Sequence, residues 1–237
     1  MKNVNVEAPV IAEVAPGPQL HAAARCTMYR QLGWWLGFPW EDFHAAALAG
    51  EIAAATREWS GSLPWTVAGL DNLCARLGEV EGGVEADYDL FQSAYVGLFD
   101  VGAGGPPCPL YGGSWAGDRQ KTMEEALRFY RFFGLTISTD ERELPDHVTT
   151  QMEFLHFACF KEAGAVGSGN DAGQYRRATR DFLARHPARW LPLALQKLNS
   201  LDDERCPPFW HALLELAGSC CSSDLAWLVA SEGPVEK

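Results

Sequence analysis

The chain has 237 residues, of which 47% are hydrophobic and 11% aromatic, including nine tryptophans. This length and composition are typical of a folded globular protein and exclude an intrinsically disordered one. The 31 acidic residues outnumber the 19 basic ones and give a formal net charge of −12. That charge excludes nucleic acid as the main partner, because phosphate binding needs a basic face.

The N-terminal residues 1–19 predict a flexible tail. Prolines interrupt it, Glu7 and Glu13 add negative charge, and the apolar stretch of a secretory signal peptide does not follow. No apolar run approaches the length of a membrane span, so we expect no membrane insertion.

The remainder, residues 20–237, reads almost throughout with helical period. The first half of the chain predicts amphipathic helices over 21–37, 40–59 (divided at Gly50), 67–80 and 88–98, and Asp118 begins another after the Gly- and Pro-rich run 102–109. In the second half, Asp146 begins a helix that is apolar almost all round and therefore belongs at the centre of the fold. The Gly- and Ser-rich segment 164–173 predicts a hinge loop, and three helical segments follow over 174–185, 190–198 and 208–231. The fold class is all-α, with about ten helices in a single helical domain.

The seven cysteines are odd in number and form no Cys-x-x-Cys pair. Zinc and iron–sulfur ligation are therefore unsupported, and the pattern suits reduced thiols in a cytoplasm.

One short stretch, Glu143-Leu144-Pro145-Asp146-His147, joins an acidic loop to the apolar helix. Pro145 suits a helix entrance, and Asp146 is a good N-cap because its carboxylate can accept from free amide N–H groups. Acidic groups beside aromatic ones also suit a peptide with paired arginines and an apolar segment, because carboxylates bind guanidinium by charge-assisted hydrogen bonds.

The stretch resembles the Glu-x-Pro-Asp-His signature of the TorD/DmsD/NarJ family, cytoplasmic chaperones of molybdenum oxidoreductases. Two upstream blocks fit in order and spacing: 109–115, which resembles the family's Pro-x-Tyr-x-Ser-x-Tyr loop, and the aromatic-rich 95–99. Gly113 stands where the family often has Ser, and Trp115 replaces Tyr. The Cys-Pro-Leu-Tyr-Gly-Gly form looks most like chaperones of the ethylbenzene dehydrogenase and perchlorate reductase type.

The resemblance implies a cytoplasmic protein without cofactor or catalysis, present as a monomer or homodimer. It implies that the partner is the apo catalytic subunit of a molybdopterin oxidoreductase, bound through its N-terminal signal segment until the cofactor is inserted. The residues expected to contact that client are Tyr95, Leu98, Phe99, Pro109, Tyr111, Trp115, Glu143, Leu144, Pro145, Asp146 and His147.

Two other classes of function stay open from the residues alone. Two Glu-x-x-His matches, Glu41 with His44 and Glu153 with His156, place both side chains on one helix face, as in di-iron helical bundles. Such bundles need two further inward glutamates, and none is evident. The third alternative is a helical scaffold or regulatory domain that has no peptide groove.

Overall fold

The structure is a computed structural model that describes residues 17–78, 86–137, 144–201 and 207–235. Within these ranges the chain forms only helices. In chain order they are α1 (Pro18–Trp35), α2 (Glu41–Leu48), α3 (Glu51–Ser60), α4 (Leu70–Gly78), α5 (Tyr88–Tyr95), the π-helical turn η2 (Val96–Asp100), α6 (Gly113–Ala116), α7 (Arg119–Phe132), α8 (Val148–Gly167), α9 (Gly173–Arg185), α10 (Pro187–Leu198) and α11 (Pro208–Glu232). The prediction of an all-α fold is confirmed.

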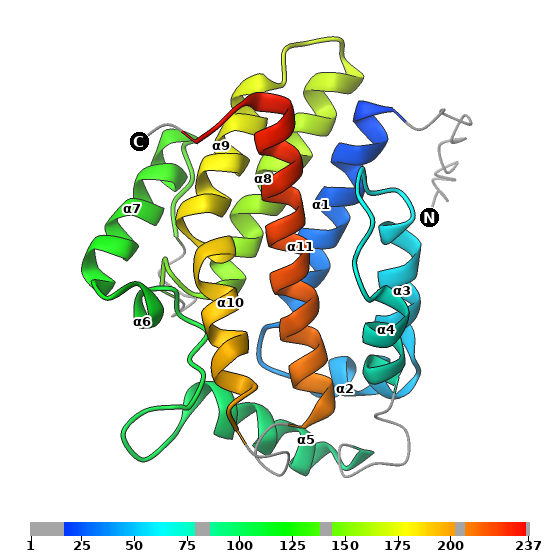
Figure 1. Cartoon of the computed structure of the whole chain (residues 1–237), viewed down its shortest axis with the longest axis vertical. Helices are drawn as coiled ribbons and strands as arrows, with labels where there is room; N and C mark the ends of the chain where they lie inside the picture. The colour runs from blue at the N-terminus through cyan, green and yellow to red at the C-terminus, as the bar shows by residue number, and fades with distance from the viewer. Residues whose placement is uncertain (1–16, 79–85, 138–143, 202–206, 236–237) are drawn as a thin grey trace, which may run out of the picture.

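The centre of the molecule is a set of long helices that lie side by side (Figure 1). α1 packs along α8, and α11 packs against α10, α9 and α4. α3 and α4 flank this centre on one side and α7 on the other (Figure 1). The close approach of α1 to α8 depends on Gly33, because a Cβ there would lie 3.2 Å from the Cβ of Met152.

The buried residues of α8 and α11 form much of the core. Met152 and Leu155 of α8 and Leu213 and Leu214 of α11 have no exposed surface, which confirms the central position predicted for the apolar helix. The side chain of Phe160, also on α8, is exposed to solvent and is not part of this core.

α11 is also, among the described helices, the one long and apolar enough to span a membrane by length and composition. In the structure, 56% of its apolar stretch is buried inside the protein. The core helix of a globular protein can be equally long and apolar. Because α11 packs against α4, α9 and α10, we interpret it as a core helix.

A buried ion network joins three of the central helices. Arg25 of α1 lies 2.6 Å from Glu162 of α8 and 2.9 Å from Asp224 of α11. The hydroxyl of Tyr29 donates to Asp224 over 2.7 Å. Burial raises the pKa of both carboxyl groups, and Arg25 opposes that shift. The network therefore holds charge in the core only through mutual pairing.

Several predicted boundaries differ from the structure; α4 begins at Leu70 rather than 67, and α10 begins at Pro187 rather than 190. α1 begins at Pro18, inside the predicted tail, because proline is favoured in the first turn of a helix. α8 continues to Gly167, so part of the segment predicted as a hinge loop is helical and 168–172 connects α8 to α9. The hinge itself stays a prediction.

Candidate functional site

The two motif loops lie together in the structure. Tyr111 and His147 form an isolated antiparallel β-bridge, and the N–H of Gly112 donates to the backbone oxygen of Asp146 over 2.8 Å. Between them the chain makes the excursion that contains α6 and α7. Loops that are distant in sequence therefore lie side by side in the structure.

Asp146 is the buried centre of this site. Its side chain has no exposed surface, and its Oδ2 accepts a hydrogen bond from the N–H of Gly113 over 3.0 Å. Its backbone oxygen accepts from the side-chain amide of Gln151 over 3.0 Å, and that amide in turn accepts from the indole N–H of Trp190. Burial raises the pKa of Asp146, while the Gly113 hydrogen bond and Arg119 oppose the rise.

The predicted N-cap role of Asp146 is wrong, because His147 caps α8 instead. Its Nδ1 accepts from the backbone N–H of Thr149 and lies 2.7 Å from the Thr149 hydroxyl. Burial lowers the pKa of His147 to about 4, so the ring is neutral at neutral pH and can act as this acceptor. The ring also packs against Tyr111, with 4.7 Å between ring centroids.

Arg119, at the start of α7, is a site residue that sequence reasoning missed. Its guanidinium carbon lies 5.0 Å from the centroid of the Tyr111 ring, and its Nε lies 3.8 Å from Oδ2 of Asp146. The Arg119 side chain is 48% exposed, so it lies at the surface end of the site. Its position directly after the predicted helix start at Asp118 was the available signal.

The glycine pair of the first loop is required by this geometry. A Cβ at Gly113 would lie 2.6 Å from Cγ of Arg119 and 2.8 Å from Oδ2 of Asp146. A Cβ at Gly112 would lie 3.0 Å from the side-chain nitrogen of Gln151. Both approaches leave too little room for a side chain, which explains glycine at the position where the family often has Ser.

The apolar members of the site lie at its edges. The indole N–H of Trp115 donates to the backbone oxygen of Pro109 over 2.9 Å, so the loop fixes the ring. Leu144 is 37% exposed, and the backbone oxygen of Pro145 accepts from the hydroxyl of Tyr130 over 2.8 Å.

The surface beside these residues is shallow. The pocket next to Trp115 has a volume of only about 10 Å³, which is room for one water molecule. A bound peptide would therefore lie on the surface of the two loops or open this pocket.

Three predicted contact residues lie elsewhere, in the core. Tyr95, Leu98 and Phe99 are at most 2% exposed, and the ring of Tyr95 packs against Trp210, 5.2 Å away. Their burial favours a packing role over client contact. Glu143, the remaining predicted contact, lies outside the described residues.

The Glu-x-x-His pairs do not assemble a metal site. The ring of His44 packs on that of Phe91 at 4.9 Å, and Nδ1 of His156 lies 2.9 Å from the backbone oxygen of Cys26. In the part of the chain that the structure describes, no group of three His, Cys, Asp or Glu side chains is placed to hold a metal ion.

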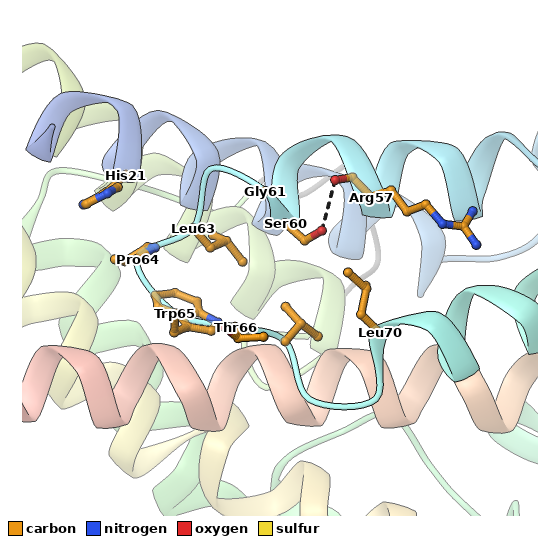
Figure 2. A pocket seen from close by; sticks show the side chains of 10 residues that line it. His21, Arg57, Ser60, Gly61, Leu63, Pro64, Trp65, Thr66 and Leu70 are labelled. Atoms are coloured by element: carbon orange, nitrogen blue, oxygen red, sulfur yellow. Dashed lines mark hydrogen bonds between the residues drawn. The ribbon is translucent and has the colours of Figure 1, made fainter. Parts of the chain in front are cut away.

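A larger pocket, of about 630 Å³, lies apart from the motif loops (Figure 2). It lies between the start of α1, the end of α3 and the loop that leads to α4, and Trp65 lines it. Figure 2 shows the guanidinium of Arg57 pointing away from the pocket, along α3. No sequence motif indicated it.

The comparisons with known proteins agree with the resemblance. The family described as nitrate reductase delta subunit matches residues 63–196, more than half of the chain. The selenate reductase assembly chaperone protein of Thauera selenatis is 42% identical over 117 residues, 48% of this chain and 61% of the relative. The chlorate reductase assembly chaperone protein of Ideonella dechloratans is 40% identical over 116 residues, 48% of this chain and 60% of the relative.

A third relative is similar over most of its length. The perchlorate reductase assembly chaperone protein of Dechloromonas aromatica (strain RCB) is 31% identical over 196 residues, 82% of this chain and 85% of the relative. With the first two relatives the match spans about three fifths of their length. The family match over more than half of the chain and the similarity to this third relative show that the chain belongs to the nitrate reductase delta subunit family, the TorD/DmsD/NarJ group.

Proposed function

We propose that this protein is a cytoplasmic chaperone that binds the N-terminal signal segment of the apo catalytic subunit of a molybdopterin oxidoreductase. It retains that subunit until the molybdenum cofactor is inserted and then releases it for export. The relatives named as assembly chaperones of selenate, chlorate and perchlorate reductases support a client of this class. The protein acts by binding and release, without turnover.

The observation that carries the proposal is the convergence of three kinds of group on the joined loops. Asp146 supplies a carboxylate, Tyr111 supplies a ring that already accepts a guanidinium at 5.0 Å, and Leu144 supplies exposed apolar surface. Paired arginines followed by an apolar stretch, the composition of a twin-arginine signal segment, offer the complementary groups.

Apolar surface continues beside the loops. Trp115 is half-buried and lines the small pocket together with Leu193 of α10, whose side chain is 43% exposed. An apolar segment that follows the arginines can lie along this edge, where burial of its side chains adds about 25 cal/mol per Å². The arginines then select the client, and the apolar edge adds affinity.

Titration calorimetry with a synthetic peptide of paired arginines and an apolar segment tests the proposal. Tyr111→Leu keeps apolar bulk but removes the aromatic face, so affinity should fall about threefold to tenfold, the effect of one cation–π contact. Tyr175→Leu is the matched control, because that ring, near the start of α9, stacks on Phe133 instead. Peptide that binds both variants as tightly as the wild type would place the client site elsewhere.

A further inference from the structure

Arg119 already makes the two contacts that the client arginine is expected to make. Its guanidinium carbon lies 5.0 Å from the ring centroid of Tyr111, and its Nε lies 3.8 Å from Oδ2 of Asp146. Asp146 has no exposed side-chain surface, whereas Arg119 is 48% exposed. Arg119 therefore covers the carboxylate from the solvent side.

The contact between the two side chains is loose. A separation of 3.8 Å is an ion pair without a direct hydrogen bond. Oδ1 of Asp146 is buried and accepts no hydrogen bond from any residue that the structure describes. A buried carboxylate oxygen without a donor costs free energy, so this group would gain from a second, better-placed cation.

The backbone at Gly113 is shaped around this arrangement. A Cβ there would meet Arg119 at 2.6 Å and the Asp146 carboxylate at 2.8 Å. The absence of a side chain at Gly113 thus leaves the space in which Cα and Cγ of Arg119 lie beside the carboxylate.

We propose that Asp146 and the face of Tyr111 form a guanidinium subsite that Arg119 fills in the free protein, and that a client arginine binds there by displacing Arg119. This inference rests on the proposed function, since that function supplies the arginine. Arg119 is then an internal competitor. Apparent affinity for the client is reduced by the fraction of molecules in which the subsite is already filled. The subsite also prefers a client arginine over a client lysine. A planar guanidinium can stack on Tyr111 and pair with Asp146 at the same time, so it replaces both contacts of Arg119.

Peptide affinity of Arg119→Ala provides the main test. A subsite that Arg119 fills most of the time should bind the paired-arginine peptide about threefold to tenfold more tightly once Arg119 is removed. Lys121→Ala is the matched control, because it removes the same charge from the exposed face of the first turns of α7. Arg119→Lys keeps the charge and loses the planar fork, so its affinity should lie between those of the wild type and Arg119→Ala. An affinity of Arg119→Ala equal to or weaker than that of Lys121→Ala would overturn the inference.

A second measurement needs no client. N-acetyl-arginine amide should raise the melting temperature of Arg119→Ala and leave the wild type and the double variant Arg119→Ala/Asp146→Asn unchanged. Failure of the peptide to bind the wild type and Arg119→Ala, with stabilisation of Arg119→Ala by the amide, would refute the proposed function and retain the subsite. If the peptide binds Arg119→Ala no more tightly than the wild type and the amide has no effect, the proposed function is retained and the subsite is refuted.

Discussion

Two neighbouring residues, Asp146 and His147, contribute opposite chemistry to the motif. Asp146 brings a carboxylate into the protein and joins the two loops through Gly112 and Gly113. His147 stays neutral and accepts a hydrogen bond from the N–H of Thr149, one of the N–H groups in the first turn of α8 that have no partner within the helix. Asp146 thus positions a charge, and His147 stabilises the start of the helix that follows it.

The neutral state of His147 predicts a loss of stability in acid. Burial lowers its pKa from about 6.5 to about 4, so the unfolded chain takes up a proton that the folded protein refuses. The contribution of this group to the free energy of unfolding is therefore complete above about pH 6.5. It is lost as the pH drops toward 4, and the loss is on the order of 3 kcal/mol at most. Burial lowers the pKa of His186 to about 4 as well, with the same sign.

His147→Asn isolates the contribution of His147, because asparagine keeps a cap acceptor but does not titrate. Denaturant unfolding from about pH 7 to about pH 5 should show a shallower loss of stability in the variant than in the wild type. Parallel curves would mean that the imidazole of His147 accepts a proton in the folded state without penalty.

The sequence could predict the two motif loops, but neither the part played by Arg119 nor the position of Tyr95, Leu98 and Phe99 in the core. The N-cap assignment failed because the Asp146 carboxylate accepts a hydrogen bond from the N–H of Gly113, 33 residues away in the chain. Arg119 was missed for the same reason, since its partners Tyr111 and Asp146 come from the two loops on either side of α7. Local propensity contains no information on such contacts.

At the scale of helices, the network around Arg25 ties α1, α8 and α11 together. Arg25→Met would leave Asp224 buried without its cation and Glu162 paired only loosely, with Arg176 at 4.0 Å, at a cost of about 3–5 kcal/mol in the free energy of unfolding. Denaturant unfolding monitored by helical circular dichroism measures this cost.

The triple variant Arg25→Met/Glu162→Gln/Asp224→Asn is the matched comparison. It removes every charge of the network and should recover much of the lost stability, because neutral polar groups cost less to bury than unpaired charges. A single variant as stable as the wild type, or a triple variant no better than the single one, would contradict this account of the core.

Most helices could be predicted from the sequence, because apolar residues recur with helical period along them. The start of α8 next to Pro145 and the ends of α9 and α10 follow from such local signals. The continuation of α8 through Gly164 to Gly167 could not, because glycine has low helix propensity and the closeness of Gly167 to Gln19 of α1, 2.5 Å from the position of a Cβ, is a tertiary contact.

For the whole molecule, the formal charge of −12 should act on client binding over distance. A peptide with paired arginines is attracted by this field, so its association should slow and its affinity should weaken as salt is added. Calorimetry or stopped-flow mixing across a salt series measures the effect.

A peptide with lysines in place of the arginines is the control for this prediction. It has the same charge and should show a similar dependence on salt, but a lower affinity at every salt concentration, because lysine cannot pair and stack as a planar fork. Affinity that does not change with salt would mean that apolar contact alone drives binding.

The bridge between Tyr111 and His147 also joins the two ends of one segment of the chain. The excursion that it closes contains α6, which packs against α10, and α7, which packs against α9 and also contacts Phe154 of α8. Opening the bridge alone leaves the packing of α1, α8 and α11 in place, and α7 stays in contact with α8 through Tyr130 and Phe154, so this local opening costs less free energy than global unfolding. A ligand that contacts both loops stabilises the bridge, and by linkage the opening of the bridge weakens the binding of the ligand. Under the proposed function, pairing of this short stretch of backbone is coupled to retention of the client, and its opening to release.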